Sequence, residues 1–136
     1  MLQRIQSVYL IIATILSLCS MTLDLFVTKD LIIKASAHTS LLIAGFLMIG
    51  ETVAPIFLFK NRSLQKRICY MAILMQLFFM IVLLVTVHKQ LPGGLSGIEG
   101  FQFAGIFPLI NAILIYLAIR GINKDDELIR SMDRLR

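Results

Sequence analysis

The chain has 136 residues, of which 58% are hydrophobic, and its mean hydropathy is +0.88. Soluble domains are usually about 45–50% apolar, so the composition excludes an ordinary soluble domain and indicates an integral membrane protein. The formal net charge of +5 would by itself suit nucleic-acid binding, and the positions of the charges decide against that interpretation.

Four apolar runs are long enough to cross about 30 Å of hydrocarbon as helices. They cover residues 5–23, 39–59, 68–87 and 101–119. The first run is longer than the apolar region of a secretory signal peptide, which has about 7–15 residues, so we expect it to be retained. The sequence therefore predicts a single all-α membrane domain over residues 1–136, folded as an antiparallel four-helix transmembrane bundle.

The first and third connections between these runs are predicted to lie on the outer side of the membrane. Residues 24–38 contain two short β-rich runs on either side of a polar turn at residues 28–30, a pattern that predicts a β-hairpin. A two-stranded hairpin alone is only marginally stable, so we expect it to rest on the helix ends or the membrane interface. Residues 88–100 contain a proline and several glycines and are predicted to form a mobile turn.

The second connection, residues 60–67, is short and basic. Ten of the 13 basic residues would lie on the side of the membrane that holds this connection and both chain ends. Cytoplasmic segments carry such an excess, so both termini are predicted to be cytoplasmic, and we expect no nucleic-acid partner. The residues that we expect to contact anionic lipid headgroups or a partner here are Lys60, Arg62, Lys66 and Arg67.

Beyond Gly121 the apolar residues recur at helical spacing and charged residues fill the other positions. This pattern predicts an amphipathic cytoplasmic helix over residues 121–136, with Asn123 or Asp125 as its N-terminal cap. The helix either continues the fourth span or lies along the inner membrane surface. The basic residues that we expect to contact a partner or lipid in this tail are Arg130, Arg134 and Arg136.

Three segments on the predicted cytoplasmic side carry a resemblance to a known family. They are residues 3–6 (QRIQ), 59–65 (FKNRSLQ) and 125–136 (DDELIRSMDRLR). Together they resemble an uncharacterised family of small bacterial four-span membrane proteins, over essentially the whole chain. The resemblance implies an inner-membrane location and favours a cytoplasmic partner. Because that family is itself a domain of unknown function, it implies no activity, substrate or catalytic residue.

Each predicted span contributes a polar side chain at one depth. Glu51, Gln76 and Asn111 each lie eight residues from the cytoplasmic end of their span, and Thr14 lies at the matching level of the first span. At 1.5 Å per residue this level is about 12 Å inside the span. Small residues flank these positions, so we predict that the polar groups point inward and form hydrogen bonds between helices.

Glu51 is the acid in this layer, and no basic residue lies in the middle of a span to pair with it. One hypothesis is that a protonated Glu51 holds the helices in register through hydrogen bonds worth about 0.6–2 kcal/mol each. The other is that Glu51 takes up and releases a proton or cation in a transport cycle, with Pro55 and Pro108 as kinked, movable points.

His38 and His88 are both predicted at the outer ends of their spans, but a zinc site usually needs three or four protein ligands. We therefore predict no metal and no other cofactor, and the chain shows no arrangement for nucleophilic catalysis. The expected role is that of a non-enzymatic accessory or scaffold protein, within a larger inner-membrane complex or as a homo-oligomer. The alternative is a small proton- or cation-coupled transporter or channel that uses Glu51.

Overall fold

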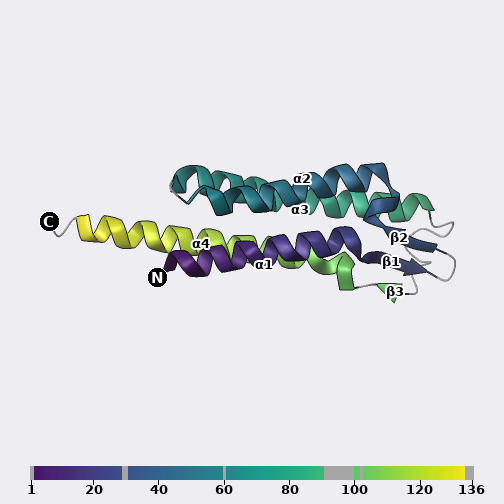
Figure 1. The fold of residues 1–136 in the computed structure, drawn as a ribbon, viewed down its shortest axis with the longest axis horizontal. Helices are drawn as coiled ribbons and strands as arrows, with labels where there is room; N and C mark the ends of the chain where they lie inside the picture. The colour runs from purple at the N-terminus through teal and green to yellow at the C-terminus, as the bar shows by residue number, and fades with distance from the viewer. Residues whose placement is uncertain (1, 29–30, 60, 91–99, 102, 134–136) are drawn as a thin grey trace.

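The computed structural model describes residues 2–28, 31–59, 61–90, 100–101 and 103–133 (Figure 1). Four long helices make up most of it: α1 (Leu2–Thr22), α2 (Thr39–Phe57), α3 (Arg62–Gln90) and α4 (Phe107–Asp133). All four are long and apolar enough to cross a membrane. The predicted set of four such helices is therefore confirmed.

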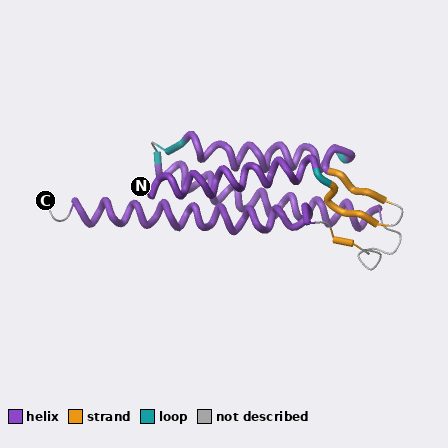
Figure 2. Tube along the Cα trace, turned by 60° about the horizontal axis from the view of Figure 1, so that its bottom comes forward, coloured by secondary structure: helices purple, strands orange, loops and turns teal. Residues whose placement is uncertain are grey.

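The helices run side by side, and the chain direction alternates from each helix to the next in sequence (Figure 1). α1 packs mainly against α4, and α2 packs mainly against α3. Contacts between α3 and α4 and between α1 and α2 join the two pairs. The first residue of α1 and the last residue of α4 consequently lie at the same end of the molecule (Figures 1 and 2).

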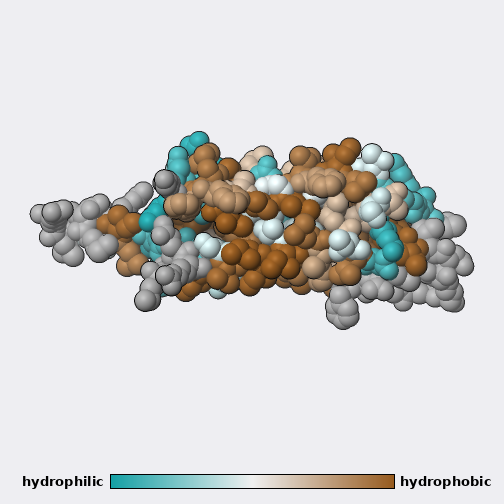
Figure 3. All heavy atoms as spheres, viewed as in Figure 1, coloured by the Kyte–Doolittle hydropathy of each residue, from teal (hydrophilic) through white to brown (hydrophobic). Residues whose placement is uncertain are grey.

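Buried positions recur at alternating spacings of four and three residues along each helix. On α3 the series is Gln65, Cys69, Ala72, Gln76, Phe79 and Leu83. A mean period of 3.5 residues is that of helices packed knobs into holes, so each helix presents one narrow stripe to its neighbours. The remaining faces are apolar and exposed, and Figure 3 shows hydrophobic side chains along the middle of the molecule and hydrophilic ones near its ends.

The buried hydrophobic residues form two clusters. The sheet-side cluster includes Leu41, Met48, Phe79, Leu83 and Val87. The tail-side cluster includes Leu10, Ala13, Cys69, Ala72, Ile115 and Ile119. The clusters share no residue, and on α3 one ends at Ala72 while the other begins at Phe79. The core is therefore interrupted near the middle of the helices.

A small antiparallel sheet covers one end of the bundle (Figure 2). β1 (Asp24–Thr28) pairs with β2 (Leu31–Lys34), so the predicted hairpin is confirmed. A third strand, β3 (Gly100–Phe101), pairs with the other edge of β1. Leu25 and Ile33 are buried in the sheet-side cluster, which seats the hairpin on the helix ends. This packing explains how so small a sheet is stable, because an isolated hairpin is not.

The predicted mobile turn falls mostly on residues 91–99, which lie outside the described residues. The positions on either side of it belong to regular structure. Residues 88–90 are the last of α3, and Gly100 opens β3. α3 is therefore longer than its predicted span at the sheet end.

α3 is also longer at its other end, where most of the predicted basic connection is helical. The cause is Asn61, whose Oδ1 accepts a hydrogen bond from the Leu64 N–H at 3.2 Å. A side-chain oxygen at this position satisfies one of the N–H groups that a helix start leaves unpaired. α3 therefore begins at Arg62, immediately after its cap.

α4 differs from the prediction at both ends. It follows a short 3₁₀ turn (Phe103–Ile106), and Pro108 is its second residue. A proline in the first turn starts a helix without removing a hydrogen bond, so Pro108 does not kink the interior of a span. α4 then continues unbroken to Asp133. The tail is therefore an extension of the fourth helix, and neither Asn123 nor Asp125 caps a separate one.

Replacing Asn61 with alanine should lower the free energy of unfolding by about 1 kcal/mol, because the cap of α3 is lost. The measurement is denaturant unfolding in detergent, followed by circular dichroism. Ser63→Ala is the control, since Ser63 is an exposed residue in the same turn. Equal effects of the two substitutions would contradict the assignment of the cap.

Candidate functional site

A layer of polar side chains lies between the two hydrophobic clusters. It consists of Ser17 on α1, Thr52 on α2, Gln76 on α3 and Asn111 on α4, each no more than 1% exposed. Asn111 Nδ2 donates a hydrogen bond to Ser17 Oγ at 2.9 Å, and Ser17 in turn donates to the carbonyl oxygen of Ala13. We call these four residues the polar layer, and it joins α1 to α4 near mid-length.

Two of the residues predicted for an inward-facing layer, Gln76 and Asn111, belong to it. The other two, Thr14 and Glu51, are only half-buried. Thr14 Oγ1 donates to the carbonyl oxygen of Leu10 in its own helix, and Glu51 forms no hydrogen bond or ion pair within the described residues. Neither side chain joins its helix to a neighbour.

The positions that sequence reasoning missed are Ser17 and Thr52. Successive residues on a helix are turned by about 100°, so a residue at the right depth can still face the wrong way. Thr52 lies on the buried stripe of α2 with Met48 and Pro55. Glu51, one residue earlier, lies on the flank of that stripe. The sequence signal that could have identified Thr52 is the alternating spacing of four and three residues between inward-facing positions. The depth of a residue within its span does not say which way its side chain faces.

The polar layer is incompletely satisfied by the described residues. Gln76 Nε2, Gln76 Oε1 and Asn111 Oδ1 are buried and have no hydrogen-bond partner among them. A buried polar group left unpaired costs about 1–3 kcal/mol. Packing alone would favour apolar residues at these two positions, so their polarity needs another reason.

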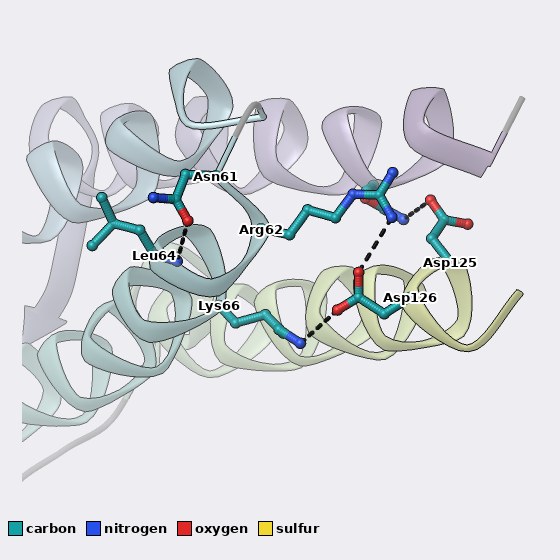
Figure 4. Close-up of polar contacts among 7 residues, drawn as sticks. Asn61, Arg62, Leu64, Lys66, Asp125 and Asp126 are labelled. Atoms are coloured by element: carbon teal, nitrogen blue, oxygen red, sulfur yellow. Dashed lines mark hydrogen bonds and ion pairs between the residues drawn. The ribbon is translucent and has the colours of Figure 1, made fainter. Parts of the chain in front are cut away.

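A second polar group lies at the end of the bundle that holds both termini (Figure 4). Gln6 Nε2 on α1 donates to Asp125 Oδ2 on α4 at 2.7 Å, and both residues are buried. The next residue of α4, Asp126, accepts from Arg62 Nη1 at 3.2 Å and from Lys66 Nζ at 2.7 Å, both on α3. We call these five residues the polar clasp. Two consecutive acids of α4 thus hold different neighbouring helices.

Two further contacts tighten the same end of the bundle. A Cβ atom on Gly121 would lie 2.9 Å from Gln6 Cγ, so the missing side chain lets α1 approach α4 beside the clasp. Gln65 Nε2 donates to the carbonyl oxygen of Pro55 at 3.0 Å. Pro55 lies in the last turn of α2, where the same carbonyl oxygen also accepts from the Leu58 N–H at 3.3 Å. Gln65 therefore fastens the end of α2 to the start of α3.

The basic residues that were predicted to contact lipid or a partner differ in their surroundings. Arg62 and Lys66 are engaged in the clasp, and Arg67 is exposed. Lys60, Arg134 and Arg136 lie outside the described residues, as does the side chain of Arg130.

At the other end of the bundle, the His38 ring pairs with the Gln90 amide at 3.1 Å. In the part of the chain that the structure describes, no three His, Cys, Asp or Glu side chains are grouped to hold a metal.

Comparison with known proteins gave one match. A family model described as "Domain of unknown function (DUF4293)" matches residues 2–135. This range contains the helices and strands that the structure describes, the polar layer and the polar clasp. No curated protein and no solved structure matches, so the role of the site is argued from its own side chains.

Replacing Asp126 with asparagine should lower the free energy of unfolding by about 1 kcal/mol, because two cations lose their shared countercharge. The loss should shrink at high salt, since the carboxylate is 21% exposed and salt screens such pairs. Unfolding in detergent at low and high salt measures both effects. Glu127→Gln, at an exposed neighbouring position, is the control, and a loss as large in Glu127→Gln would contradict the clasp.

A double-mutant cycle tests the bond across the polar layer. Ser17→Ala and Asn111→Ala should show a coupling free energy of about 0.6–1.7 kcal/mol, the range found for hydrogen bonds between membrane helices. Ser20→Ala with Asn111→Ala is the matched cycle, because Ser20 is buried but donates to Leu16 in its own helix. Additive effects in the first cycle would show that the bond contributes nothing.

Proposed function

Because the chain belongs to the DUF4293 family, whose description gives no activity, we propose its role from its own geometry. It is an integral protein of the bacterial inner membrane without catalytic activity. It acts as an accessory or scaffold protein that presents the end of α4 to a partner protein in the cytoplasm. The lipid bilayer surrounds its four helices.

Membrane insertion is supported by the polarity of the exposed and the buried side chains. The exposed residues of the four helices include many large apolar ones, such as Ile15, Phe46, Ile81 and Ile113. The buried ones include the whole polar layer. Water would favour the opposite distribution, whereas a bilayer solvates outward-facing apolar side chains and leaves polar ones to pair inside.

The orientation is supported by the charges at the two ends of the bundle. Arg62, Lys66, Arg67, Arg120 and Lys124 gather at the end that holds both termini. The sheet end carries fewer basic residues. Since basic segments stay in the cytoplasm, both termini and the clasp are cytoplasmic, and the sheet faces the other side.

The observation that carries the proposal is the projection of α4 beyond the other helices (Figure 2). Leu128 and Ile129 are 46% and 40% exposed on it. Leu128 follows the predicted end of the span at Ile119 by nine residues, which is about 14 Å along the helix axis. The candidate apolar span found in the structure, Ala104–Ile129, does include both residues, but the four residues before Leu128 are all charged, and charges are costly in hydrocarbon. In this proposal the pair therefore lies outside the lipid and is available to an apolar groove on a protein, as in other helix-in-groove complexes.

The clasp makes this projection suitable for presenting a surface. Asp125 and Asp126, three and two residues before Leu128, contact α1 and α3. The direction of the projecting helix is thereby set by the bundle. A partner that binds it pays little to order it.

Transport through Glu51 is the less favoured alternative. The polar layer that crosses the bundle contains two amides and two hydroxyl groups, and Glu51 lies beside it on the flank of α2. A titratable relay is what a proton path needs. Proton or cation flux in liposomes that is present in the wild type and lost in Glu51→Gln would support transport over the scaffold role.

Replacing both Leu128 and Ile129 with glutamate should abolish co-purification of a specific partner from membranes, because charge replaces the exposed apolar pair. Membrane insertion and unfolding should stay unchanged, since both residues lie past the clasp. Ser131→Glu, at an exposed position of the same segment, is the control for added charge. Retention of the partner by the double variant would contradict the proposal.

A truncation gives a second test of the same surface. A chain that ends at Glu127 keeps the clasp and should also lose the partner. Deletion from Ile122 onward is less informative, because Ile122 and Asp125 are buried against the bundle and their loss would destabilise it. Failure to recover any specific partner with the wild type would also count against the scaffold role.

A further inference from the structure

A hollow lies on the outward face of α4, beside the polar clasp. It has a volume of about 350 Å³ and is lined by Arg120, Asn123, Lys124 and Glu127. Counted from the first, these are residues i, i+3, i+4 and i+7, which share one face of a helix. All four are exposed, and their side chains form no hydrogen bond or ion pair within the described residues. Two cations, an amide and a carboxylate therefore surround one space without pairing.

The tyrosines mark the level of this hollow in the membrane. The chain has three, Tyr9, Tyr70 and Tyr116, which lie four, two and three residues inside the predicted cytoplasmic ends of their spans. Tyrosine is enriched at the membrane–water interface. Arg120 directly follows the fourth span, and Lys124 lies about 8 Å beyond its end. The interfacial layer is about 5–8 Å thick on each side of a bilayer, so both cations reach the lipid headgroups.

Along the outward face of α4, the side chains follow the order of the groups in a phospholipid. Ile113 and Tyr116 are 61% and 57% exposed and suit the acyl chains and the interface. Arg120 and Lys124 come next and can donate charge-assisted hydrogen bonds to phosphate oxygens. Glu127 is the last of the series and the farthest from the membrane, where a carboxylate suits a cationic group.

The carboxylate selects among headgroups. Asp126, the neighbouring acid, already has two cations from α3, whereas Glu127 has none within the described residues. A headgroup with its own primary ammonium supplies the missing countercharge, and a purely anionic one would be repelled by Glu127. We propose that the hollow binds a phospholipid with an aminoethyl phosphate headgroup, its phosphate between Arg120 and Lys124 and its ammonium at Glu127.

This inference rests on the proposed membrane insertion, and it is independent of a partner for Leu128 and Ile129. The lipid would be held by the segment of α4 between the span and this exposed pair. It would therefore fix the depth at which α4 leaves the membrane.

Native mass spectrometry of the full chain in detergent, with one added lipid at a time, tests the choice of headgroup. The lipids are phosphatidylethanolamine, phosphatidylcholine and phosphatidylglycerol with identical acyl chains. The wild type should bind phosphatidylethanolamine about tenfold more tightly than the other two, the usual effect of one charge-assisted hydrogen bond. Phosphatidylcholine has no N–H to donate to Glu127, and phosphatidylglycerol has no cation.

Single substitutions test the residues. Arg120→Ala should weaken the binding of phosphatidylethanolamine about tenfold, because a charge-assisted hydrogen bond to phosphate is lost. Arg67→Ala is the matched control and should leave binding unchanged, since Arg67 is exposed at the same end of the bundle and does not line the hollow. Circular dichroism of each variant checks that its helices are intact.

Glu127→Gln gives a readout that a structural role would not move. It should reduce the preference for phosphatidylethanolamine over phosphatidylglycerol about tenfold, because the carboxylate that attracts the ammonium and repels the anionic lipid is gone. A general loss of folding would weaken the binding of all three lipids alike, and that result would contradict the selective role of Glu127.

Three results would overturn the proposal. Equal losses in Arg120→Ala and Arg67→Ala would reduce the site to general attraction between a basic surface and phosphate. Equal binding of phosphatidylethanolamine and phosphatidylcholine would show that the ammonium is not recognised. Displacement of the lipid by an equimolar amount of glycerophosphoethanolamine, which lacks acyl chains, would assign the hollow to a soluble phosphate ester. Loss of the cytoplasmic partner with the lipid preference intact would instead affect only the scaffold proposal.

Discussion

The arrangement depends on one constraint: each helix buries a single stripe, which holds its inward polar side chains together with apolar ones, and exposes large apolar side chains on its other faces. Between helices in lipid there is no hydrophobic force comparable to that in water, so close packing and hydrogen bonds hold the bundle together. The described contacts of this kind are concentrated at two levels. Asn111 donates a hydrogen bond to Ser17 in the middle, and the polar clasp joins three helices at the end opposite the sheet.

These levels position α4 along its length. Just before α4 begins, Ala104 packs in the sheet-side cluster. Asn111 in the polar layer then joins α4 to α1, and the clasp joins α4 to both α1 and α3. Asp125 and Asp126 reach different neighbours because adjacent residues on a helix are turned by about 100°. The clasp therefore fixes the position at which α4 leaves the bundle, and this contact links the packing of the helices to the proposed binding surface at Leu128 and Ile129.

Local features were predictable from the sequence, and pairings between distant residues were not. The hairpin followed from β-rich runs around a polar turn, and the four helices followed from apolar length. The strand β3 has only two residues, too few to show the alternating sequence pattern of a strand, and it is defined by its pairing with β1. The clasp joins residues 119 and 64 positions apart. Gly121, the predicted start of the amphipathic tail, is the position where the Gln6 side chain packs against α4. Counting depth found the level of the polar layer, but the 3.5-residue stripe was needed to choose Thr52 over Glu51.

Spin labels placed singly along α4 from Leu109 to Ser131 in liposomes would test the central claim most directly. Oxygen accessibility should oscillate with a period near 3.5 residues as far as Ile119. From Leu128 onward, accessibility to a water-soluble relaxation agent should dominate. Oxygen accessibility that stays high at Leu128 and Ile129 would mean that this segment lies on the membrane, and the account of a projecting, partner-binding helix would be wrong.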